Sequence, residues 1–178
     1  MPNTAKLTLV LGGARSGKSR YAESLITALP PHWTYVATAE AGDAEMAERI
    51  AAHRARRGPD WQTIEAPHDL PVALRTSQGR PVLVDCLTLW LSNLLLADNN
   101  IDAETALLEQ AVAASAAPVV LVANEVGSGI VPDNALGRRF RDAQGVLNQR
   151  IAALADRVVF LAAGLPMLLK DARAEDAR

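Results

Sequence analysis

The chain has 178 residues and a formal net charge of −2 at pH 7, with 49% hydrophobic and 21% charged residues. This composition is typical of a soluble globular protein, and it predicts one domain that spans residues 1–178. The charge is too close to zero to indicate binding to nucleic acid or to a membrane surface. A membrane-spanning helix needs about 18 uninterrupted apolar residues, and no segment of the sequence approaches that length.

The single cysteine, Cys86, excludes an internal disulfide and a zinc site built from several cysteines. A reducing compartment suits such a chain, so we expect a cytoplasmic protein. The N-terminal sequence also lacks the features of a signal peptide, because its apolar run Leu7–Leu11 is short and ends in glycines.

Apolar runs alternate with segments of helical periodicity along the chain. The runs predict buried strands at Leu7–Leu11, Trp33–Ala37, Pro81–Val84, Pro118–Ala123 and Val158–Ala162. The periodic segments predict helices at Ser19–Leu29, Asp43–Arg57, Leu87–Leu96, Ala103–Ala114 and Arg138–Leu154. This alternation predicts an α/β fold, with a mostly parallel sheet that carries helices on both faces. We expect the charged tail Lys170–Arg178 to lie outside the regular elements.

A glycine-rich loop joins the first predicted strand to the first predicted helix. Its residues fit the motif G-x-x-x-x-G-K-[ST] in full: Gly12, Gly13, Ala14, Arg15, Ser16, Gly17, Lys18 and Ser19. In such loops backbone amides surround nucleotide phosphates, the lysine neutralises the β- and γ-phosphate oxygens, and the hydroxyl holds Mg²⁺. A chance glycine-rich turn is the alternative, which the strand–loop–helix context disfavours. The sequence therefore predicts a P-loop NTPase-type fold that binds ATP or GTP with Mg²⁺, and Lys18 as a catalytic residue.

A carboxylate, Asp85, follows the predicted strand Pro81–Val84. Ligands of open α/β sheets bind at the carboxyl ends of the strands. Asp85 is therefore a candidate, together with Ser19, for holding the magnesium ion. The alternative is that Asp85 caps the helix that follows, and the two roles are compatible.

Of the three histidines, only His53 lies in a predicted helix. It shares a face with apolar residues of that helix, so it can be a histidine packed at the edge of an apolar stripe. Arg49 and Arg57 lie one turn away on either side. The alternative is that His53 is a nucleophile, because nearby cations favour the neutral, nucleophilic imidazole and attract a triphosphate. His32 and His68 fall in predicted loops and are better explained as solvated residues.

Further blocks of sequence add specificity to the P-loop. Glu45–Ile50 precedes His53, Trp61–Glu65 follows it, and Asn124–Pro132 (NEVGSGIVP) is accompanied by Arg138–Arg150 (RRFRDAQGVLNQR). Together with the P-loop, these blocks resemble the bifunctional adenosylcobinamide kinase/adenosylcobinamide-phosphate guanylyltransferase family of cobalamin biosynthesis, nearly from end to end.

The resemblance implies two successive reactions. ATP or GTP phosphorylates the aminopropanol hydroxyl of adenosylcobinamide, and GMP from GTP is then transferred to that phosphate, which gives adenosyl-GDP-cobinamide and pyrophosphate. The family's guanylylated histidine corresponds to His53. A wider set resembles the family's guanine-nucleotide contacts: Ala37, Thr38, Ala39, Arg54, Ala55, Arg56, Arg57 and Glu65. The resemblance also implies a homotrimer with its nucleotide site near the subunit boundaries.

A polar, glycine-containing block follows the predicted strand Pro118–Ala123. Asn124 and Glu125 come at the ligand edge of the sheet, and Gly127 and Gly129 leave the backbone after them mobile. This block is either part of the corrinoid or phosphate site or a helix cap with a turn.

Two other functions remain open from the residues alone. A small-molecule kinase of another pathway could carry the same loop. The second is a P-loop switch or ATPase that acts on a protein partner. Such a protein should have a water-positioning glutamine near the second strand, which the sequence does not clearly show.

Overall fold

A computed structural model describes residues 5–40, 57–77 and 79–172. Its elements in chain order are β1 (Leu7–Gly12), α1 (Lys18–Thr27), β2 (Trp33–Ala37), β3 (Trp61–Glu65), α3 (Leu70–Thr76), β4 (Val82–Asp85), α4 (Leu87–Leu96), α5 (Ile101–Ala114), β5 (Val119–Asn124), α6 (Ala135–Leu154), β6 (Arg157–Ala162) and β7 (Leu165–Asp171). Within these ranges, no helix combines the length and the apolar character that a bilayer crossing requires.

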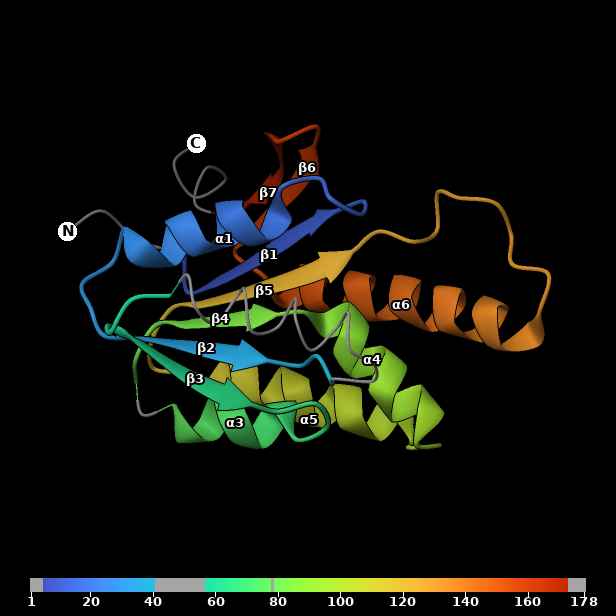
Figure 1. Cartoon of the computed structure of the whole chain (residues 1–178), viewed down its shortest axis with the longest axis horizontal. Coiled ribbons are helices and arrows are strands. Elements are labelled where there is room, and N and C mark those ends of the chain that lie inside the picture. Colours follow the sequence, from blue (N-terminus) through green and yellow to red (C-terminus); the bar gives the residue numbers. More distant parts are fainter. Residues whose placement is uncertain (1–4, 41–56, 78, 173–178) are drawn as a thin grey trace.

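The strands form one seven-stranded sheet in the order β3-β2-β4-β5-β1-β6-β7. Every neighbouring pair is parallel except β6 and β7, which are antiparallel. β1 therefore lies between β5 and β6 near the middle of the sheet (Figure 1). The predicted mostly parallel sheet is confirmed.

Helices cover both faces of the sheet, as predicted. On one face, Leu9 of β1 packs in a cluster with apolar residues of α3, α4, α5 and α6. The other face is covered by α1 (Figure 1), and there Val10 packs with Ala22 and Ile26. Successive residues of β1 thus enter opposite layers, and both are fully buried. This burial on both faces explains why the central strands read as continuous apolar runs.

The predicted bounds hold best where the elements are buried. β2 and α4 have the predicted limits, whereas α5 and α6 begin a few residues earlier than expected. Three elements were not predicted: α3, β3 and β7. The expectation for the charged tail was wrong in part, because Lys170 and Asp171 belong to β7, where both pair with β6. The predicted helix Asp43–Arg57 lies outside the described residues, apart from Arg57.

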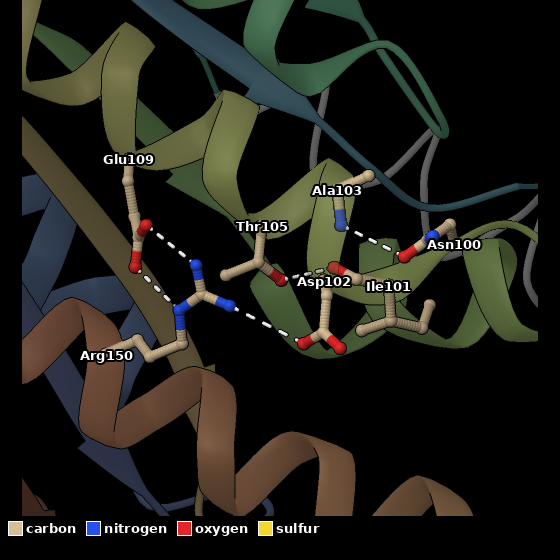
Figure 2. A network of polar contacts seen from close by, with 7 residues as sticks. All are labelled: Asn100, Ile101, Asp102, Ala103, Thr105, Glu109 and Arg150. Atoms are coloured by element: carbon tan, nitrogen blue, oxygen red, sulfur yellow. Dashed lines mark hydrogen bonds and ion pairs between the residues drawn. The ribbon is translucent and has the colours of Figure 1, made fainter.

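A bidentate ion pair fastens α5 to α6 (Figure 2). The Arg150 guanidinium donates from Nε and from a terminal nitrogen to the two carboxylate oxygens of Glu109, both at 2.7 Å. Its other terminal nitrogen lies 3.6 Å from an oxygen of Asp102. α5 begins beside this contact, where the Asn100 side chain accepts from the Ala103 amide at 3.1 Å. Hydrogen bonding from Arg150 lowers the pKa of Glu109.

Candidate active site

The P-loop has the strand–loop–helix setting that its motif requires. β1 ends at Gly12, and α1 begins at Lys18 with Gly17 as its N-cap. The φ angles of Gly12 and Gly17 are 151° and 96°, in the region that favours glycine. A Cβ added at Gly12 would also lie 2.4 Å from the carbonyl oxygen of Leu161. The backbone conformation of the loop therefore requires both motif glycines.

The turn between β6 and β7 is hydrogen-bonded to this loop. The amide of Gly164 donates to the carbonyl of Ser16 at 3.0 Å. Ala163 and Gly164 both have positive φ angles, of 52° and 81°, so the hairpin turns tightly beside the loop. This contact could not be predicted from the sequence, because β7 was not predicted.

Lys18 is buried at the start of α1, with 7% of its surface exposed. Its Nζ donates to the Gly13 carbonyl at 2.6 Å, so the amine folds back over the loop. Burial lowers the pKa of Lys18, while the acidic groups of Cys86 and Asp85 oppose that shift. The Ser16 hydroxyl is also buried, and it has no hydrogen-bond partner among the described residues. A bound phosphate could satisfy both groups.

Asp85 ends β4, and its carboxylate is held by Tyr35 of β2. The Tyr35 hydroxyl donates to Oδ2 of Asp85 at 3.1 Å. The guanidinium carbon of Arg57 lies 3.6 Å from the centre of the Tyr35 ring, which is a cation–π contact. Burial, and next the negative charge of Asp85, raise the pKa of Tyr35, so the phenol remains a donor. Arg57 is thus the first described residue after the His53 segment, and it lies against a partner of Asp85.

The capping alternative for Asp85 is wrong. The N-cap of α4 is Cys86, and no side chain caps this helix. The Cys86 peptide is instead bonded on both sides by Thr38, whose hydroxyl accepts from the Cys86 amide at 2.8 Å and donates to its carbonyl at 2.7 Å. Burial raises the pKa of the Cys86 thiol to about 11, so the thiol is protonated at neutral pH.

The other predicted nucleotide contacts lie at the same edge of the sheet. Ala37, the last residue of β2, is level with Glu65 on β3 and with Asp85 on β4. Thr38 and Ala39 follow directly, but Thr38 is fully buried and its hydroxyl is used by Cys86. In the loop itself, Ala14 and Arg15 are exposed, whereas Gly13 and Ser19 are half-buried.

His53, the candidate nucleophile, lies outside the described residues, and so do its predicted neighbours Arg54, Ala55 and Arg56. The two other histidines lie in loops, as expected. His32 contacts Asp60 at 3.4 Å and His68 contacts Glu40 at 3.1 Å.

No group of three or more His, Cys, Asp and Glu side chains able to hold a metal ion occurs within the described ranges. Mg²⁺ does not need one, because it is commonly held by one or two protein oxygens together with water and substrate phosphates. Ser19 and Asp85 offer such oxygens. Asp85 is level with Val122 of β5, which is level with Val10 of β1, two residues before the loop begins at Gly12. The residues therefore fit a magnesium ion bound with a nucleotide.

Solved structures resemble this fold at low sequence identity. The flagellar accessory protein FlaH from Methanocaldococcus jannaschii matches with a TM-score of 0.53 and 12% identity, covering 93% of this chain and 78% of that one. An ATPase from the type III secretion system of pathogenic bacteria matches with a TM-score of 0.54 and 10% identity, covering 92% of this chain and 56% of that one. These matches show the fold alone, and they support the P-loop NTPase type.

Sequence comparisons reach further. The family model described as "Cobinamide kinase / cobinamide phosphate guanyltransferase" matches residues 8–169. The bifunctional adenosylcobalamin biosynthesis protein CobP of Pseudomonas aeruginosa is 51% identical over 166 residues, covering 91% of this chain and 96% of that protein. CobU of Salmonella typhimurium, which carries the same bifunctional description, is 41% identical over 182 residues, covering 92% of this chain and 99% of that protein. The chain therefore belongs to the cobinamide kinase/cobinamide phosphate guanyltransferase family.

Proposed function

We propose that this chain phosphorylates adenosylcobinamide and then guanylylates the product. In the first step the aminopropanol hydroxyl oxygen bonds to the γ-phosphorus of ATP or GTP, and the nucleoside diphosphate leaves. In the second step the new phosphate becomes bonded to the α-phosphorus of GTP, and pyrophosphate leaves. The main support is that the family similarity runs through a P-loop whose lysine is buried against its own loop.

Phosphoryl transfer depends on placement and charge neutralisation more than on covalent help. The loop amides cradle the phosphates at the positive end of α1. Lys18 exchanges the Gly13 carbonyl for phosphate oxygens. Ser19 and Asp85 hold Mg²⁺, which when bound neutralises charge on the transferring group. Tyr35 keeps the Asp85 carboxylate in one orientation through its 3.1 Å hydrogen bond.

The guanylyl step uses His53 as the nucleophile. Its imidazole nitrogen bonds to the α-phosphorus of GTP and pyrophosphate leaves; the corrinoid phosphate then takes GMP from the histidine. Two displacements thus replace one, and each has a good leaving group. The guanine nucleotide is held by the sheet edge and by the arginines after His53: Ala37, Thr38, Ala39, Arg54, Ala55, Arg56, Arg57 and Glu65. Because the Thr38 hydroxyl is used by Cys86, Thr38 acts here through its backbone and position.

A homotrimer is the expected assembly, and β7 is the surface that best supports subunit contact. Four apolar residues of this edge strand are between 53% and 69% exposed: Leu165, Met167, Leu168 and Leu169. Exposed apolar surface of this kind marks interaction sites. The β6–β7 turn also bonds to the P-loop, so a subunit contact there would lie near the nucleotide.

The proposal is tested by adding the two nucleotides in turn to purified protein and adenosylcobinamide. With ATP and Mg²⁺ alone, mass spectrometry should find adenosylcobinamide phosphate and nothing further. Addition of GTP should convert it to adenosyl-GDP-cobinamide. Lys18→Ala should lose the first step, because the γ-phosphoryl group loses its fixed cation. A protein that binds ATP but leaves the corrinoid unphosphorylated would instead favour a kinase of another pathway.

A further inference from the structure

The end of β5 lies directly against the P-loop. Asn124 is level with Gly12 in the parallel pairing of β5 with β1. The next residue, Glu125, donates its amide to the Gly12 carbonyl at 3.1 Å. The last peptide of β5 is therefore bonded to the first glycine of the phosphate-binding motif, and a shift in one would move the other.

The side chain of Asn124 belongs to the face of the sheet that carries α1 and the P-loop. Val120 and Val122, which precede it at the strand's period of two, both pack in the cluster that contains Ala22 and Ile26 of α1. Asp85 is level with Val122 on the neighbouring strand β4. Among the described residues, no partner bonds to the Asn124 side-chain amide, although it is half-buried.

Side chains from the opposite face hold the Asn124 backbone in place. The Asn124 amide donates to the Thr88 hydroxyl of α4 at 2.7 Å. Its carbonyl accepts from Nδ2 of Asn148 on α6 at 3.1 Å. Oδ1 of Asn148 in turn accepts from Nε2 of Gln144 at 2.8 Å. Both polar groups of the Asn124 peptide are thus fixed, by two different helices.

The hydrogen-bonded side-chain amides of Gln144 and Asn148 are an unfavourable way to stabilise the fold alone. Gln144 is fully buried and Asn148 is 6% exposed. Oε1 of Gln144 has no hydrogen-bond partner among the described residues. An unsatisfied buried acceptor destabilises a fold, and apolar residues of similar shape are often neutral or better. The Gln144–Asn148 pair instead fixes the position of the Asn124 backbone at the edge of the P-loop.

We propose that Asn124 contacts the γ-phosphoryl group in the kinase step and that Thr88, Asn148 and Gln144 are positioning residues for it. The Asn124 amide would donate a hydrogen bond to a γ-phosphate oxygen. It thereby adds a neutral, directional donor to the charges of Lys18 and Mg²⁺. The proposal rests on the kinase activity proposed above.

The first test is Asn124→Ala. The donor serves the transition state more than ground-state binding, so the kinase kcat should fall about tenfold or more. The dissociation constant of ATP, measured without corrinoid, should change less than about threefold. A kcat within twofold of wild type would overturn the contact. Wild-type protein assayed beside it separates the outcomes, since an inactive wild type would refute the kinase function instead.

The second test is a double-mutant cycle between α6 and the strand end. Asn148→Leu and Gln144→Met should each lower kcat in wild type, but should lower it no further in Asn124→Ala, because they act through that side chain. Full additivity would overturn the positioning role. Gln149→Met, on the exposed side of the same helix, is the matched control and should leave kcat unchanged. Thermal unfolding checks that each variant is folded, and Gln144→Met completes the cycle if Asn148→Leu does not fold.

Discussion

Asp85 is the proposed metal-site residue with the best-described contacts. Its carboxylate accepts from Tyr35, leaves α4 uncapped and acts electrostatically on Lys18. A carboxylate held in this way beside a phosphate-binding loop suits the water shell of Mg²⁺ better than a purely structural task.

Asp85→Asn should therefore raise the Mg²⁺ concentration that half-saturates the kinase reaction. The amide keeps the shape of the side chain but loses its charge, and changes of this kind typically weaken metal affinity about 10- to 100-fold. The measurement is a Mg²⁺ titration of the initial rate at saturating ATP, supported by Mn²⁺ binding to the protein–nucleotide complex. Asp98→Asn, at an exposed position, is the control. An unchanged titration curve would remove Asp85 from the metal site.

His53 should carry GMP, and the two substrate labels distinguish this from phosphorylation. The protein should take up label from [α-³²P]GTP but not from [γ-³²P]GTP. The label should survive alkali and be lost in acid, because protonation of the P–N bond makes imidazole a good leaving group. His53→Ala should remain unlabelled and lose guanylyl transfer, yet keep its kinase activity, since that step needs no protein nucleophile.

Arg57→Ala should weaken the α-label without abolishing it, because Arg57 attracts the triphosphate but does not react. Persistent α-label on His53→Ala would contradict the assignment and direct attention to His32 or His68.

At this scale the sequence predicted the P-loop well, because all of its chemistry lies in eight consecutive residues. It could not predict the bond between Tyr35 and Asp85. That bond depends on the register of β2 against β4, which are far apart in the chain, and Tyr35 reads only as one more apolar residue of a strand.

Among the elements, α5 and α6 offer a stability test that is separate from catalysis. Glu109 forms two 2.7 Å bonds with Arg150, and its side chain is 27% exposed (Figure 2). Because the pKa of Glu109 is lowered on folding, the pair stabilises the protein above the unfolded pKa of about 4.3 and stops doing so as the pH falls through the folded value.

Glu109→Gln should therefore lower the free energy of unfolding by about 1 kcal/mol at pH 7. The difference from wild type should begin to shrink below about pH 4 and should disappear below the folded pKa, where Glu109 is protonated in both states. Urea denaturation at the two pH values measures this. Asp102→Asn is the comparison and should cost less, because Asp102 is 93% exposed and 3.6 Å from Arg150. A loss independent of pH would refute the ionic origin.

The elements that the sequence missed are two edge strands and one short helix. β3 (WQTIE) is an edge strand with exposed and half-buried residues, so it lacks a continuous apolar run. α3 is only seven residues long and has Pro71 near its start. β7 carries a proline and a lysine and pairs on one side only. Periodicity identifies elements by what they bury, and the two strands bury little; α3 does bury Leu70, Pro71, Ala73 and Leu74, but seven residues are too few to show a clear helical repeat.

For the whole molecule, the exposed apolar side chains of β7 form the surface proposed above as a subunit contact. Met167 is opposite Phe160 and Leu168 is opposite Val159, so the two side chains lie on different faces of the strand. Composition gave no hint of such a surface, since it arises only when the hairpin places these residues at the edge of the sheet.

Met167→Lys combined with Leu168→Lys should convert the expected trimer to monomers, because two charges cannot be buried unpaired in a subunit contact. Sedimentation equilibrium measures the mass, and circular dichroism checks the fold. Val72→Lys, which alters an exposed apolar residue of α3, should leave the assembly intact. A double variant that keeps the wild-type mass, or a monomeric wild type, would count against a subunit contact at β7.

The claim that one chain carries out both transfers is tested most directly by the origin of the two phosphorus atoms in the product. Wild-type protein is incubated with adenosylcobinamide and a mixture of [γ-³²P]GTP and [α-³³P]GTP, and the corrinoid product is isolated. The account predicts adenosyl-GDP-cobinamide with the two labels in equal molar amounts, since one phosphorus comes from each of two GTP molecules. A product that carries only the γ-label would contradict it, because the chain would then be a kinase alone.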